Sequence, residues 1–71
     1  MYIDYTIKVS EKLPDDLKAD IKKMEDAYNR DDFFEYVKYE DSVLVAIKAC
    51  AMGGIINDSK LNELMRRFGW R

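Results

Sequence analysis

The stretch that decides the fold is Phe33–Gly54, which reads FFEYVKYEDSVLVAIKACAMGG. Its apolar residues fit two different structures. Wound as a helix, the stretch gathers one apolar face from Phe33, Val37, Leu44, Ile47 and Ala51. Laid out as strands, 33–39 and 43–48 are rich in β-forming residues, and a turn at 40–42 would join them into a hairpin.

Three features favour the helix. The apolar stripe runs on without a break into the Ala-rich segment 46–52. Gly53 and Gly54 then supply the left-handed stop that commonly follows a helix. The hairpin turn would contain no glycine, which tight hairpins favour. We therefore predict a helix over 32–52 and keep the hairpin as the alternative.

Two further helices are predicted on either side of this stretch. Pro14, followed by two aspartates, is typical of a first helical turn, and an apolar stripe at steps of three and four extends this helix over 14–29. Asn57 is a suitable cap for a last helix over 57–68. The apolar residues of these two helices are Leu17, Ile21, Met24 and Tyr28 in the first, and Leu61, Leu64, Met65 and Phe68 in the last.

The N-terminal arm, 1–12, shows a different period. Ile3, Tyr5, Ile7 and Val9 alternate with polar residues, which is the period of a half-buried strand over 2–9. An all-helical chain has no other strand to pair with it. The arm must then lie across the first two helices, pair with the arm of a second copy, or add to the sheet of a partner.

These elements predict an all-α single domain, 1–71, with three helices and an N-terminal extended arm. The alternative fold class is α+β in the order β-α-β-β-α. A length of 71 residues, with 48% hydrophobic and 37% charged residues, suits one small compact domain rather than a disordered chain.

The composition also restricts the chemistry. The chain has no histidine and one cysteine, Cys50, so the commonest general base and the zinc ligand sets are missing. Adjacent acids such as Asp15-Asp16 suit helix starts, and the two glycines do not form a phosphate loop. We expect no enzyme, no cofactor and no metal. With a lone thiol, no secretory signal and no apolar run of about 18 residues, we expect a cytoplasmic protein that does not enter the membrane.

Charge divides unevenly along the chain. Through Asp41 there are 12 acidic and 7 basic residues, net −5, whereas the remainder carries net +3. The tail, 66–71, interleaves arginines with Phe68 and Trp70, residue types that suit protein interfaces, nucleic acid, or a capped helix end with Trp70 folded over the core. An overall charge of −2 disfavours nucleic acid.

Aromatic residues exceed what a small core can enclose. Nine of the 71 residues are Phe, Tyr or Trp, and on the predicted second helix Phe34, Val45 and Met52 point away from the main apolar stripe. Exposed apolar patches mark interaction sites. We predict a non-catalytic protein–protein interaction module that binds an unknown protein partner or forms a homodimer, the alternative being a small nucleic-acid-associated protein that uses its basic-aromatic C-terminus. The candidate interaction residues are Tyr5, Phe34, Tyr39, Arg66, Arg67 and Trp70.

A recurrent pattern of core and capping residues carries a family resemblance. It comprises the segments 13–17 and 46–56, followed by Leu61, Leu64, Arg67 and Phe68-Gly69. This pattern resembles small uncharacterised helical accessory proteins of bacterial conjugative elements and phages. The resemblance covers about residues 13–69 and leaves out the arm. It implies a three-helix fold and a regulatory or accessory role in a mobile element, and it assigns no catalytic or binding residue.

Overall fold

The computed structural model describes residues 3–70 and contains three helices, α1 (Asp15–Asn29), α2 (Phe33–Met52) and α3 (Asp58–Arg67). The predicted all-α class is confirmed, because residues 3–70 contain no strand and the stretch with the alternative hairpin is helical. Each helix begins and ends within one residue of its predicted bounds. Met1 and Tyr2 of the predicted arm and Arg71 of the predicted tail lie outside the described residues.

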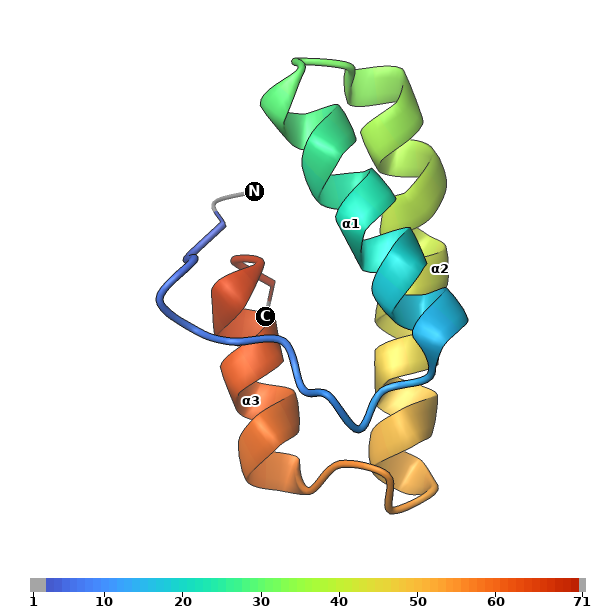
Figure 1. The fold of residues 1–71 in the computed structure, drawn as a ribbon, viewed down its shortest axis with the longest axis vertical. Coiled ribbons are helices and arrows are strands. Elements are labelled where there is room, and N and C mark those ends of the chain that lie inside the picture. Colours follow the sequence, from blue (N-terminus) through green and yellow to red (C-terminus); the bar gives the residue numbers. More distant parts are fainter. Residues whose placement is uncertain (1–2, 71) are drawn as a thin grey trace.

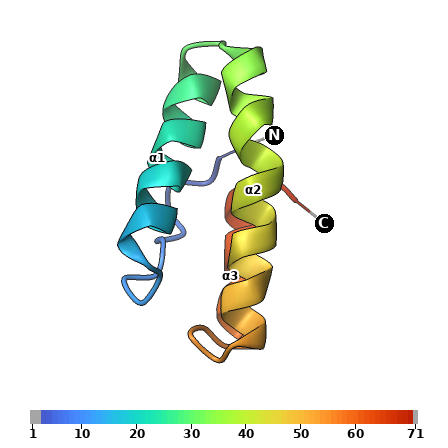
Figure 2. The ribbon, with the colours of Figure 1, turned by 90° about the vertical axis from the view of Figure 1, so that its right-hand side faces the viewer.

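The longest helix, α2, is the spine of the molecule. Figure 1 shows α1 lying antiparallel beside the first half of α2, while α3 returns antiparallel beside the second half. The segment before α1 crosses from α3 to the start of α1. Figure 2 shows α2 in front of α3, and its side turned toward the viewer is not covered by another described element.

Side-chain caps and left-handed residues determine where the helices begin and end. The Asp32 carboxylate accepts the Glu35 N–H at 3.1 Å at the start of α2, and the Asn57 amide oxygen accepts the Lys60 N–H at 2.8 Å at the start of α3. Pro14 precedes α1 as its N-cap and not as its first helical residue. Gly54, at a φ of 80°, takes the left-handed conformation expected after α2.

The core lies where α1 and α3 meet α2. Its largest fully buried side chains are Phe68, Met24, Ile47, Leu64 and Val43. Cys50 is a buried free thiol in the same cluster, as an inert core cysteine would be.

The apolar face of α2 is turned differently from the sequence prediction. We expected Phe33 and Val37 on the core side, yet both are exposed. The buried residues of α2 are Tyr36, Val43, Ile47 and Cys50. The period of the apolar residues could not show which side of α2 faces the core, because α2 is apolar around more than half of its circumference.

The predicted strand in the arm was wrong. The Ile7 N–H donates to the Asp4 carbonyl at 3.2 Å, which closes a turn, and Tyr5 at its centre is exposed. The Asp4 N–H donates to the Arg67 carbonyl at 2.7 Å, and the Lys60 ammonium donates to the Lys8 carbonyl at 2.7 Å. The arm therefore lies against α3 and α1, not across α1 and α2. Bonds to α3 take the place of strand pairing for three of its backbone groups, the Asp4 N–H and the carbonyls of Ile7 and Lys8.

Candidate interaction surface

Arg67 at the end of α3 is the polar centre of the molecule. Its side chain is buried and donates to the Glu25 carboxylate of α1 from Nη2 at 2.8 Å and from Nε at 3.0 Å. The third guanidinium nitrogen, Nη1, donates to the Ile7 carbonyl at 2.5 Å. Burial raises the pKa of Glu25, and the hydrogen bonds and charge of Arg67 oppose that rise. Arg67 thus joins α1, α3 and the arm, and it has little surface left for a partner.

Glu40 is a half-buried acidic residue on α2, one helical turn after Tyr36. Its Oε2 accepts a hydrogen bond from the Tyr36 hydroxyl and another from the Trp70 indole at 3.4 Å. The Trp70 ring packs on Phe68 with 4.8 Å between ring centroids. Burial, followed by the hydrogen bond and charge of Glu40, raises the pKa of Tyr36 far above its usual value. This arrangement ties the C-terminal segment to α2 and is structural.

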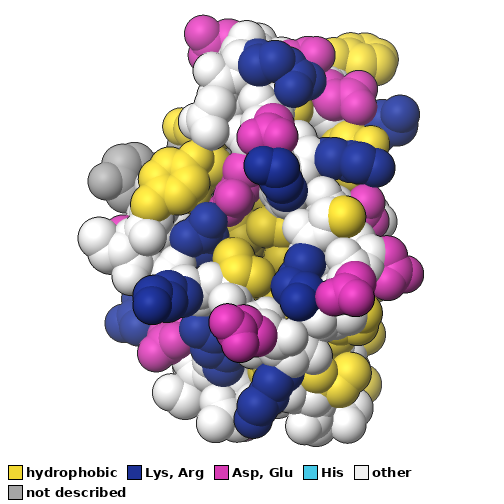
Figure 3. Space-filling model, viewed as in Figure 1, with side chains coloured by type: hydrophobic (Ala, Val, Ile, Leu, Met, Phe, Trp, Pro, Cys, Tyr) yellow, Lys and Arg dark blue, Asp and Glu magenta, His cyan; other side chains and the backbone are white. Residues whose placement is uncertain are grey.

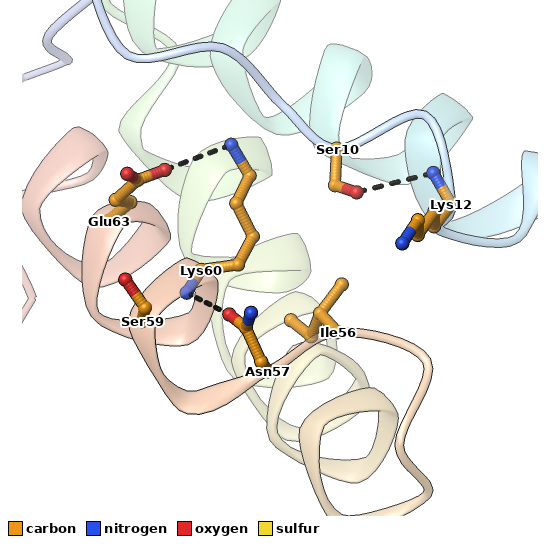
Figure 4. Close-up of a pocket in the computed structure, with 7 residues that line it drawn as sticks. All are labelled: Ser10, Lys12, Ile56, Asn57, Ser59, Lys60 and Glu63. Carbon is orange, nitrogen blue, oxygen red and sulfur yellow. Dashed lines mark hydrogen bonds and ion pairs between the residues drawn. The ribbon is translucent and has the colours of Figure 1, made fainter.

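A polar cleft of about 300 Å³ lies between the arm and the first turn of α3 (Figure 4). Figure 4 shows the Lys60 side chain reaching the Glu63 carboxylate, a contact of 3.1 Å. The other lining residues are Ser10, Lys12, Ile56, Asn57 and Ser59. Among residues 3–70 there is no group of three side chains that could hold a metal ion. The cleft is an open polar groove between the arm and the start of α3.

The outer face of α2, which we define as Phe34, Val37, Val45 and Met52, is the largest exposed apolar feature of the described chain. These side chains are exposed to 88%, 47%, 67% and 90%. Their spacing of three, eight and seven residues places them on one side of the helix, and their exposure shows that no other described element covers that side. Phe33, exposed to 75%, adjoins this face and forms a shallow apolar groove with Phe34, Val37 and the stem of Lys38.

The face of the molecule seen in Figure 3, a quarter turn from the view of Figure 2, has a different character. Figure 3 shows lysine, arginine and acidic side chains interspersed over α1, α3 and the arm, with hydrophobic side chains visible between α1 and α3. Such a mixed charged surface is what a solvated face requires. The contrast makes the outer face of α2 the candidate interaction surface.

The six residues predicted for interaction do not form one cluster. Phe34 belongs to the outer face of α2, while Arg66 and Tyr5 are exposed elsewhere, with the Tyr5 ring centroid 5.2 Å from the Arg67 guanidinium. Tyr39 and Trp70 are half-buried against the core, and Arg67 is buried. Sequence reasoning did not place Phe33 and Val37 on the surface. The second stripe through Phe34, Val45 and Met52 was the signal that could have found them.

The fold and this surface define a class: a small all-α domain that leaves one apolar helix face without a partner in the described chain. Comparisons with protein-family models, with curated proteins and with solved structures found no match. No helix in the described range is both long and apolar enough to cross a membrane. The function must therefore be argued from the surface itself.

Proposed function

We propose that this protein is a non-catalytic interaction module that binds another protein surface through the outer face of α2. The supporting observation is a row of large apolar side chains, from Phe34 to Met52, that is exposed along the whole helix. A small domain can bury only a limited part of its apolar surface. Leaving a phenylalanine, two valines and a methionine in water on one helix side is unfavourable unless a partner covers them.

The polar residues beside this row suit a specific interface. Lys38, Asp41 and Lys48 are exposed on the same side of α2 as the apolar row. Asp41 and Lys48 lie between the apolar side chains of the row, where they can pair with opposite charges of a partner. A helix face of this kind fits an apolar groove or another helix, which supports a protein partner.

The nucleic-acid alternative has less support. Of the predicted basic-aromatic tail, Arg67 is engaged by Glu25 inside the fold and Trp70 packs on Phe68. Among the described residues of this tail, Arg66 is the exposed cation, and one cation contributes little to phosphate binding. A cytoplasmic location is also part of the proposal, and the lone thiol Cys50 supports it. An accessory role in a mobile element is a further part, and the family resemblance supports it.

Site-specific photo-crosslinking in the cells that express the protein tests the proposal. A photoreactive residue at exposed Ser42, beside the outer face, should give protein adducts, and the substitution Val45→Asp should abolish them. The same photoreactive residue at Lys23, exposed on α1, is the matched control. Equal adducts from both positions, or adducts that survive Val45→Asp in a folded protein, would contradict the proposal.

A further inference from the structure

We propose that the partner of the outer face of α2 is a second copy of the same chain, packed antiparallel about a twofold axis between positions 44 and 45. This inference rests on the proposed function, because it uses the same surface and names its occupant. The argument comes from the order of charged and apolar residues along α2.

Positions on the outer face are matched about the midpoint between Leu44 and Val45. Val37 and Met52 lie equally far on either side of this point, and so do Asp41 and Lys48. In an antiparallel pair, residues equally distant from the twofold axis lie opposite each other. Val37 of one copy therefore faces Met52 of the other, and Val45 lies beside its own equivalent at the axis.

The charges select this orientation. At 100° per residue, Asp41 and Lys48 lie within the apolar row, between Val37 and Val45 around the helix and only about 20° apart. About this twofold axis each Asp41 lies level with Lys48 of the other copy near the middle of the contact, so two opposite-charge pairs form. A parallel pair would instead place Asp41 on Asp41 and Lys48 on Lys48, which is repulsive.

The charges also select the register. Sliding the antiparallel pair so that Phe34 faces Met52 places Lys38 opposite Lys48 and leaves Asp41 facing Val45. Sliding it further in the same direction, so that Lys38 faces Asp41, places Met52 opposite position 27, before the start of α2, and leaves it without an apolar partner on that helix. The register about positions 44 and 45 pairs Asp41 with Lys48 and Val37 with Met52, and it places Phe34 opposite the exposed Ile55, just beyond the end of α2.

The surface is large enough for a weak dimer. The exposed apolar side chains of the outer face and Phe33 amount to on the order of 600 Å² per copy, since a whole aromatic side chain contributes about 150–250 Å². Burial of all of this area in both copies would amount to about 1,200 Å², which is the lower limit for specific protein interfaces. We therefore expect a reversible monomer–dimer equilibrium.

Sedimentation equilibrium of the purified full chain tests the dimer, with a mass that should rise from 8.4 kDa toward twice that value with concentration. Asp41→Lys or Lys48→Asp alone should weaken the dimer about tenfold, because both symmetry-related pairs become like-charged. The double swap, and an equimolar mixture of the two single variants, should restore it. A folded protein that stays monomeric up to about 1 mM would overturn the proposal.

Disulfide trapping tests the register in a Cys50→Ala background. Val45→Cys should crosslink to itself at the axis, whereas Lys48→Cys should not, since its two copies would lie about 10 Å apart along the helices. Crosslinking of both positions would mean that the helices pair in parallel. Crosslinking of neither position would mean that the dimer uses a different surface. Either result overturns the proposal. A monomeric protein that still gives Ser42 adducts of a foreign mass would overturn self-association alone and leave the proposed function standing.

Discussion

Arg67 and Glu25, 42 positions apart in the sequence, form an ion pair in which both side chains are almost fully shielded from water. The 2.8 Å contact joins the end of α3 to the middle of α1, two helices that otherwise pack on α2 and not on each other. The same guanidinium holds the arm through the Ile7 carbonyl. The Arg67 side chain therefore links α1, α3 and the arm, away from the outer face of α2.

Arg67→Met should destabilise the protein by about 3 kcal/mol, because it leaves the shielded Glu25 carboxylate without its cation. Glu25→Gln keeps an acceptor oxygen and should cost about half as much. Urea unfolding measures both, and the exposed neighbour Arg66, changed to Met, is the matched control with a loss below about 0.5 kcal/mol. Similar losses for Arg66→Met and Arg67→Met would show that the ion pair does not hold the fold together.

Tyr36 predicts a loss of stability in alkaline solution. Burial and the neighbouring Glu40 raise its pKa above the ordinary value of 10.0, so the folded protein keeps the phenolic proton that the unfolded chain releases. The folded state then binds more protons, and the free energy of unfolding falls as pH rises above about 10. Chemical unfolding across this range measures the slope. Tyr36→Phe should lower stability at neutral pH by about 1 kcal/mol through the lost hydrogen bond, and should flatten the alkaline slope. An unchanged slope in Tyr36→Phe would contradict this assignment.

The lowered pKa of Asp4 predicts a loss of stability in acidic solution. The Thr6 hydroxyl at 2.6 Å and the Thr6 N–H at 3.0 Å donate to its carboxylate and lower the pKa of Asp4 below 3.8. The contribution of this turn to stability is therefore present above the unfolded pKa and is lost as pH falls through the folded one. NMR titration of the Asp4 carboxyl carbon should show its pKa rising toward 3.8 in Thr6→Val and staying low in Thr6→Ser, which keeps the hydroxyl donor. Equal values in the two variants would rule out the hydroxyl as the main cause.

The elements that local sequence determines were predicted well. Helix bounds follow from capping residues and glycine, and Asp32, Asn57 and Gly54 act within three residues of the helix ends that they define. The arm was mispredicted because alternation describes a strand only where another strand can pair with it. Arg67 and Lys60 instead donate hydrogen bonds to carbonyl groups of its backbone. The sequence around these two residues contains no pattern that predicts those bonds.

The candidate surface was predicted only in part, for a different reason. Phe34, Val45 and Met52 were expected to point away from the core, and they do. Phe33 and Val37 were assigned to the core because α2 carries two apolar stripes, and periodicity alone does not say which one α1 and α3 cover. That choice is made by the volume of Tyr36, Val43 and Ile47 against α1 and α3, a property of the packed structure.

The two glycines after α2 predict a contrast within one dipeptide. Gly54 has a φ of 80° with open space around it, so Gly54→Ala should cost about 1 kcal/mol through backbone strain alone. Gly53 has a φ of −82°, which suits any residue, and a Cβ there would lie 3.4 Å from the Ala49 carbonyl oxygen, an ordinary contact. Gly53→Ala should therefore be neutral or stabilise the protein by up to about 0.5 kcal/mol, because it reduces the freedom of the unfolded chain. Thermal unfolding of the two variants side by side measures the difference, and equal melting temperatures would mean that the left-handed residue does not determine how α2 ends.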